Sequence, residues 1–170
     1  MKRPEENEYS DWYAGYVSLV QEADIISALQ NQIDEIKDFF SAISVEKELY
    51  RYADGKWTIK EVLGHLIDGE RVFAYRAFRF GRNDANPLTG FDENPYVANS
   101  NSNDRKLADL IEEFTLLRTA NMFVFNNLKE SDWDNIGIAS ENEISVRALA
   151  YIMVGHVRHH VKILKERYLA

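Results

Sequence analysis

Four long segments in which apolar residues recur every three or four positions restrict the fold of this chain most strongly. They cover about residues 24–43, 58–80, 104–127 and 145–168. This spacing places the apolar side chains on one face of an α-helix. No pair of alternating segments is long enough to build the core of a sheet. We therefore expect an all-α protein, a four-helix bundle in one domain covering residues 1–170.

Local signals mark where these helices begin. Asp24 is a residue type that caps helix N-termini, and it directly precedes the first apolar segment. Thr58 and Glu61 have the spacing of a capping box at the start of the second segment. Ser145, or Asn142 before it, is suited to cap the fourth helix.

The segments between the helices are polar and rich in turn-forming residues. Residues 81–103 contain two prolines, two glycines and many asparagines, so we expect a long connection without regular structure. A connection of this length can return along a helix of roughly 35 Å, which allows the third helix to run parallel to the second. Residues 129–142 form a second polar connection. The aromatic and polar residues 1–20 indicate an irregular or short helical arm packed on the bundle.

Composition excludes several classes of function. The net charge is -8, which repels a phosphate backbone, so we expect no nucleic-acid partner. No apolar run is long enough to span a bilayer, and the charged first residues lack the apolar core of a signal peptide. With 0 cysteines, the chain has no disulfide and no thiolate ligand. We expect a cytoplasmic protein without a membrane partner.

Three of the four histidines lie close together in the last apolar segment, at positions 156, 159 and 160. His156 and His160 are four residues apart and continue the apolar stripe, so they stack on the core-facing side of the helix. Two imidazoles placed in this way can bind one metal ion. They can equally be two core histidines that are hydrogen-bonded to the backbone or to a carboxylate. His159 lies on the flank of the stripe.

His65, the remaining histidine, lies at the edge of the apolar face of the second helix. Helix bundles build metal sites from side chains on facing helices, so His65 can join His156 and His160. Three protein ligands with an open fourth position are typical of a catalytic site rather than a closed structural one.

Three carboxylates are candidates to orient a ligand or to move protons: Glu70, Asp68 and Asp92. Glu70 lies near the centre of the apolar face of the second helix, where a carboxylate is unusual. It can instead reach outward to solvent, or form a salt bridge with an arginine such as Arg76 or Arg118. Each of the three can also be a structural or solvated charge.

At these residues the chain resembles the DinB-like superfamily, and within it the YfiT-like branch. The resemblance covers nearly the whole chain from about Tyr9, and its motifs are specific through their order and spacing together. They are YADGKWTIKEVLGHL at 52–66, ERVFAYR at 70–76, PLTGFD at 87–92, SVRAL at 145–149, GHVRHH at 155–160 and ERY at 166–168. Relatives often carry an acidic residue directly after the first histidine of the pair, where this chain has Val157.

The resemblance implies an up-down-down-up bundle with a long crossover between helices two and three, and a homodimer. It implies one divalent metal ion per chain, nickel or zinc, on His65, His156 and His160. It also implies a metal-dependent hydrolase or a thiol S-transferase, acting on a small molecule with water or a low-molecular-weight thiol such as bacillithiol. The alternative is a non-catalytic metal-binding protein or a purely structural four-helix bundle.

Overall fold

A computed structural model of the chain describes residues 2–170, and within this range it contains six α-helices and one β-hairpin. The helices are α1 (Ala14–Ser18), α2 (Ile25–Ser41), α3 (Ile59–Gly81), α4 (Glu93–Asn99), α5 (Leu107–Asn126) and α6 (Val146–Ile163), and the strands are β1 (Ile136–Ala139) and β2 (Asn142–Ser145). Short 3₁₀ turns occupy Glu6–Glu8, Asp11–Tyr13, Val45–Lys47, Ser102–Asp104 and Glu130–Asp134, and a π-helical turn at Leu164–Tyr168 continues α6.

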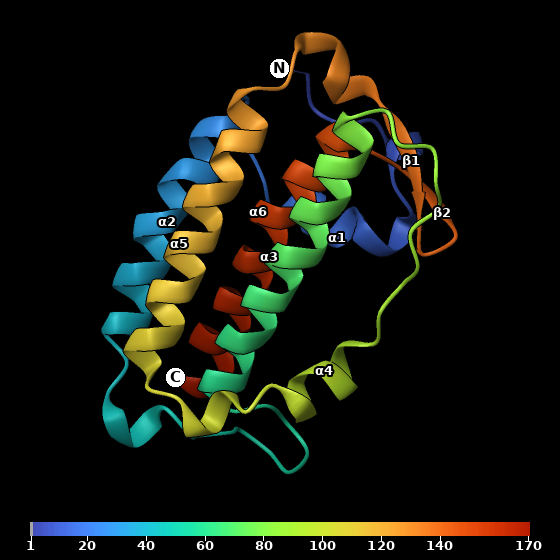
Figure 1. The fold of residues 1–170 in the computed structure, drawn as a ribbon. Coiled ribbons are helices and arrows are strands. Elements are labelled where there is room, and N and C mark those ends of the chain that lie inside the picture. Colours follow the sequence, from blue (N-terminus) through green and yellow to red (C-terminus); the bar gives the residue numbers. More distant parts are fainter. Residues whose placement is uncertain (1) are drawn as a thin grey trace.

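Helices α2, α3, α5 and α6 form the predicted four-helix bundle, which is confirmed with its up-down-down-up order. Figure 1 shows α2 antiparallel beside α5, and α3 antiparallel beside α6. Helices α3 and α5 pack against each other in parallel, because the long connection between them returns the chain to the end where α3 began. The predicted crossover is therefore the segment that determines the topology.

The predicted helix starts are also confirmed. The carboxylate of Asp24 accepts hydrogen bonds from two amides in the first turn of α2. Thr58 and Glu61 form both bonds of the capping box at the start of α3. At α6 the cap is Ser145 rather than Asn142, since its hydroxyl accepts from the amide of Ala148 at 2.9 Å. Polar partners thus satisfy amides that helix geometry leaves free.

The expectation that residues 81–103 lack regular structure is wrong for their second half. Helix α4 occupies Glu93–Asn99, and a 3₁₀ turn follows at Ser102–Asp104. Asp92 caps α4 by accepting from the amide of Asn94 at 3.0 Å. An Asp cap followed by an acidic residue and then by Pro95 is a helix-start signal. It is hard to recognise here, because the segment is short and rich in asparagine.

The second polar connection contains the hairpin β1–β2, which pairs Ile136 with Ser145 and Ala139 with Asn142. Its turn residues Ser140 and Glu141 have φ of 51° and 66°. A two-residue hairpin turn with positive φ at both positions is of type I′ and usually contains Asn-Gly or Asp-Gly. Because the sequence here is Ser-Glu, the turn has no such signal.

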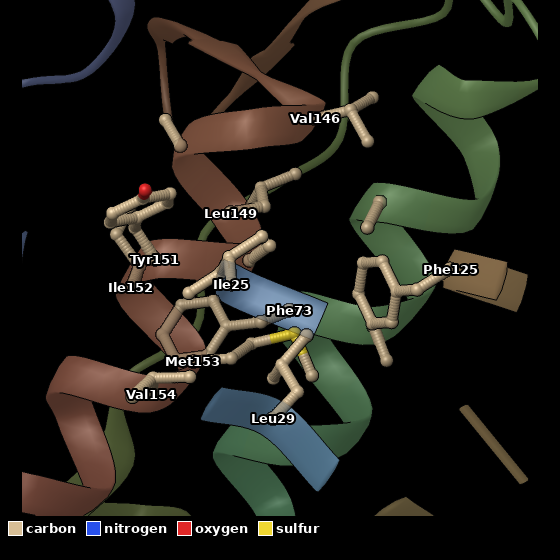
Figure 2. Packing of buried hydrophobic residues seen from close by; sticks show 14 of the residues in the cluster. Ile25, Leu29, Phe73, Phe125, Val146, Leu149, Tyr151, Ile152, Met153 and Val154 are labelled. Carbon is tan, nitrogen blue, oxygen red and sulfur yellow. The ribbon is translucent and has the colours of Figure 1, made fainter. Parts of the chain in front are cut away.

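Two clusters of buried apolar side chains fill the bundle. In the cluster nearer the start of α6, Leu29 from α2, Phe73 from α3 and Met153 from α6 point toward one another (Figure 2). The predicted N-terminal arm packs on this cluster through Val17 and Val20, which are fully buried. A side chain at Gly155 would collide with the backbone of Tyr16, so this glycine lets α1 lie directly against α6.

A buried ion pair joins α3 to α5. Nε and Nη2 of Arg118 donate to the two carboxylate oxygens of Glu70 at 2.7 and 2.8 Å. The side-chain nitrogen Nδ2 of Asn121 donates to the same carboxylate at 2.9 Å. Of the two arginines that the sequence offers as partners for Glu70, Arg118 is therefore the one that pairs with it.

The remaining donor of Arg118 extends this network to the other two bundle helices. Its Nη1 donates to the carbonyl of Leu29 and to the side-chain oxygen of Gln32, at 3.2 and 3.0 Å. Gln32 in turn donates to the carbonyl of Val154 on α6 at 3.0 Å. Each polar group in the chain of contacts has a partner, as a buried network requires.

Among the helices of residues 2–170, none combines the length and the apolar character needed to cross a membrane.

Replacing Arg118 with Met should lower the free energy of unfolding by about 3–5 kcal/mol, because Glu70 would stay buried without its cation. The matched control is Arg105→Met, which breaks a more exposed pair with Glu113 and should cost less than about 1 kcal/mol. Denaturant unfolding followed by circular dichroism measures both. Equal losses in the two variants would contradict a central role for the Arg118 pair.

Candidate metal centre

The antiparallel packing of α3 against α6 brings His65 together with His156 and His160. One ring nitrogen from each histidine lies within 4.8 Å of the other two. The Nε2 atoms of His65 and His156 are 2.8 Å apart. His156 and His160 project from successive turns of α6, as their spacing predicts.

The hydrogen bonding of these rings differs from that of ordinary core histidines. Within residues 2–170 the three rings make no hydrogen bond to a backbone group or a carboxylate, and the one hydrogen bond among them joins His65 to His156. Three nitrogens at roughly 2.0–2.1 Å from a tetrahedral cation would be about 3.4 Å apart. The separation of 2.8 Å between His65 and His156 and the outer limit of 4.8 Å for all three nitrogens bracket that value. The donor set therefore fits one divalent ion.

Burial keeps the three imidazoles neutral. It lowers the pKa of His65 to about 4 and that of His160 to about 3, with a further contribution from neighbouring histidines. The pKa of His156, which is the most deeply buried, falls well below the usual value for the same reasons. Neutral imidazole is the form that binds metals, so the cluster is ready to coordinate at neutral pH.

Aromatic rings surround the cluster. The ring of Trp57 lies 4.8 Å from that of His65 and stacks at 6.4 Å on that of His160, measured between centroids. Tyr16 and Phe73 contact His156 edge-on at 5.4 and 5.6 Å. This apolar surrounding accounts for the lowered pKa values, and no carboxylate of residues 2–170 forms a hydrogen bond with the three rings.

Gly69 provides the space that the ring of His156 occupies. It lies one turn after His65 on α3, and a β-carbon there would be 2.8 Å from Cε1 of His156. Real side chains essentially never approach this closely. The orientation of His156 therefore depends on the absence of a side chain at position 69.

An open cavity of about 320 Å³ leads to the cluster. Its walls come from the N-terminal arm, α3, α6, the start of α4 and the hairpin turn. The lining residues are Ser10, Trp12, Tyr13, Tyr16, Trp57, His65, Gly69, Phe73, Arg76, Phe91, Glu93, Ser140, Asn142, His156 and His160. The histidines thus face a space in which a small molecule can reach them.

The three candidate carboxylates do not line this cavity. Glu70 is held in the ion pair with Arg118. Asp68 is half-buried, and burial raises its pKa against the opposing charge of Arg71. Asp92 is exposed and caps α4. A catalytic role for Asp68, Glu70 or Asp92 stays a prediction.

Sequence reasoning missed several residues that do line the cavity. Glu93 directly follows the Asp92 cap, so recognition of that helix start would have drawn attention to it. The sequence suggests Arg76 only as a salt-bridge partner for Glu70. Tyr13 and Tyr16 belong to an arm without periodicity, and the signal that places them is the glycine at position 155, which faces Tyr16.

Stability of the metal-free protein should fall as the pH drops below about 6.5. In the unfolded chain the histidines bind protons near pH 6.5, whereas in the fold the pKa values of His65 and His160 are about 4 and about 3. Between the two sets of pKa values the unfolded state therefore binds more protons than the fold. Each extra proton lowers the free energy of unfolding by about 1.4 kcal/mol for every pH unit of acidification. Urea unfolding with chelator from pH 8 to pH 4 measures the slope, which His160→Gln should reduce. An unchanged slope in that variant would contradict the assignment.

Comparisons with known proteins agree with the fold. The family model of the DinB superfamily matches residues 28–164. No curated protein matches the chain. A solved structure of YfiT from Bacillus subtilis, described as a probable metal-dependent hydrolase with an unusual four-helix bundle topology, is similar to this fold with a TM-score of 0.77. Its sequence identity is 16%, and the match covers 97% of this chain and 90% of that one.

A second similar structure is that of the mycothiol-dependent maleylpyruvate isomerase, with a TM-score of 0.68 and 9% identity. The match covers 91% of this chain but spans only 63% of the isomerase. At these identities the two structures show the fold, whereas the family model covers most of the chain, including all three clustered histidines. The chain belongs to the DinB superfamily.

Proposed function

We propose that this protein is a metal-dependent enzyme in which His65, His156 and His160 hold one divalent ion, nickel or zinc. The ion would activate water or a low-molecular-weight thiol, which makes the protein a hydrolase or a thiol S-transferase. The observation that carries this proposal is the convergence of three neutral imidazoles at an open cavity. A structural metal site would be closed by a fourth protein ligand.

A divalent ion held by three neutral ligands keeps its full positive charge and supplies Lewis acidity, which lowers the pKa of a bound water or thiol. The chain itself provides the surroundings. Trp57, Tyr16 and Phe73 pack their rings against the histidines and make the surroundings apolar. The cavity beside them leaves room for a small substrate.

Two further residues of the cavity can handle protons. Among the residues that line it, Glu93 is the only carboxylate, so we assign it the role of proton acceptor. Burial, assisted by the charge of Glu93, raises the pKa of Tyr16. Its phenol therefore keeps its proton at neutral pH and can donate a hydrogen bond.

The open cavity favours catalysis over the alternative of a non-catalytic metal-binding or structural bundle. The homodimer, the cytoplasmic location, the absence of a nucleic-acid partner and the identity of the thiol stay predictions. They do not affect the chemistry assigned to the cluster.

The proposal is tested by metal content and turnover in the same preparations. Purified protein loaded with nickel or zinc should bind one ion per chain and hydrolyse a nitrophenyl ester, or join a thiol to monochlorobimane. His160→Ala should lose both properties. His159→Ala should keep both, because its ring lies outside the cluster. Tight stoichiometric binding in His160→Ala would overturn the metal assignment, and binding without turnover would favour the non-catalytic alternative.

Gly69→Ala should weaken metal binding on the order of 10–100-fold, the usual cost of disturbing a residue that orients a ligand. The new methyl group would displace the ring of His156 while leaving all three histidines in the chain. The matched control is Gly15→Ala, since that glycine has nothing within 4 Å of its potential side chain. Competition with a fluorescent chelator measures the affinities. Equal affinities in both variants would show that His156 has space to move.

A further inference from the structure

Arg76 differs from the other buried cationic residues of residues 2–170. Arg118 pairs with Glu70 at 2.7 Å, Arg147 with Glu8 at 3.2 Å, and Lys60 with Glu48 at 3.0 Å. Arg76 is only 2% exposed, and no described carboxylate forms a salt bridge with it. Buried charges are normally paired, because an unpaired one loses its hydration without compensation.

The hydrogen bonds of Arg76 leave most of its guanidinium free. Its Nη2 donates to the carbonyl of Thr89 at 3.2 Å and to the hydroxyl of Ser140 at 2.9 Å. These bonds tie α3 to the α3–α4 connection and to the hairpin turn. Within residues 2–170, Nε and Nη1 have no protein partner, and neither is sealed from accessible space. Three N–H donors, one on Nε and two on Nη1, are therefore available for charge-assisted hydrogen bonds to an anion.

Arg76 lies on the wall of the cavity that also contains the histidine cluster. Arg76 follows His65, Gly69 and Phe73 at helical spacing along one face of α3, and all four line the same cavity. His65 and Arg76 are eleven positions apart, or about 16 Å along the helix axis. The cavity thus has a metal-binding cluster toward one end and a cation toward the other.

No carboxylate of the cavity lining neutralises Arg76. Glu93 is the one acidic residue in the lining, and it forms no salt bridge with Arg76. A divalent ion on neutral histidines would add two positive charges, so the cavity as a whole would be cationic. With a single cation among neutral donors such as Ser140 and Asn142, the site suits a monoanionic carboxylate better than a phosphate dianion.

We propose that Arg76 binds the carboxylate of the substrate, so that the enzyme acts on organic acids with an apolar or aromatic body. The body would lie along Phe73 and Phe91, and the reactive group would reach the histidines. This inference rests on the proposed function for the reacting end, but the recognition of the acid depends only on Arg76 and the cavity.

The test compares two ligands that differ only in charge, 3-phenylpropionate and 3-phenylpropionamide, by calorimetry on the full chain with and without bound zinc. The wild type should bind the acid at least about tenfold more tightly than the amide, since hydrogen bonds between ionised partners are the stronger ones. This preference should disappear in Arg76→Met and persist in part in Arg76→Lys. Arg82→Met is the control, because it removes the same charge from an exposed position.

Equal affinities for acid and amide in the wild type would overturn the proposal, and so would the absence of binding of both ligands. Both results are obtained with the wild type, so they do not depend on whether a variant folds. A preference that survives in Arg76→Met would overturn it as well. The measurement without zinc separates this inference from the proposed function, because it depends neither on metal content nor on turnover. A protein without turnover can still show the preference, and an active enzyme can lack it.

Discussion

The ion pair between Glu70 and Arg118 is the centre of a hydrogen-bond network that connects all four bundle helices. It joins α3 to α5 directly, and the remaining donor of Arg118 reaches α2. From there Gln32 bonds to the carbonyl of Val154, two residues before His156. Such a network has few alternative arrangements, because shifting any one helix would leave a buried polar group without a partner. The relative placement of α3 and α6, and with it the histidine cluster, depends on this constraint.

The cavity is built from two kinds of segment, long helices and irregular connections. The three clustered histidines lie on the long helices α3 and α6, which the core holds in place. The outer walls come from the N-terminal arm, the start of α4 and the turn of the hairpin. The exposed residues of these segments can change without disturbing the packing of the bundle. We infer that the histidines define the reaction, whereas the outer walls and Arg76 select the substrate.

The sequence predicts those features that repeat or that depend on near neighbours. The four apolar stripes and the capping box at Thr58 are of this kind, and so is the pairing of His156 with His160. Joining His65 to them required only that α3 and α6 face each other. The pairing of Glu70 with Arg118 was harder to predict, because the two residues lie on different helices and meet only through the packing of α3 against α5. Arg76, six residues after Glu70 on α3, is not at the spacing of three or four residues that brings side chains together on a helix.

Helix α4 and the hairpin were missed because each is short and is stabilised by contacts outside itself. The isolated bridge between Leu88 and Ala139, for example, attaches the α3–α4 connection to the hairpin. The role of the arm in the cavity was missed for a related reason. Its aromatic residues have no period, and they are positioned by the close approach of Tyr16 to Gly155.

The contact between Gly69 and His156 also constrains how this family can diverge. A side chain at position 69 and an imidazole at position 156 compete for one volume, so substitutions at the two sites are not independent. A lineage that gains a larger residue at the first site should lose or reposition the histidine at the second. Glycine four residues after the first histidine is then a marker, readable from sequence alone, that a homologue retains the geometry of the cluster.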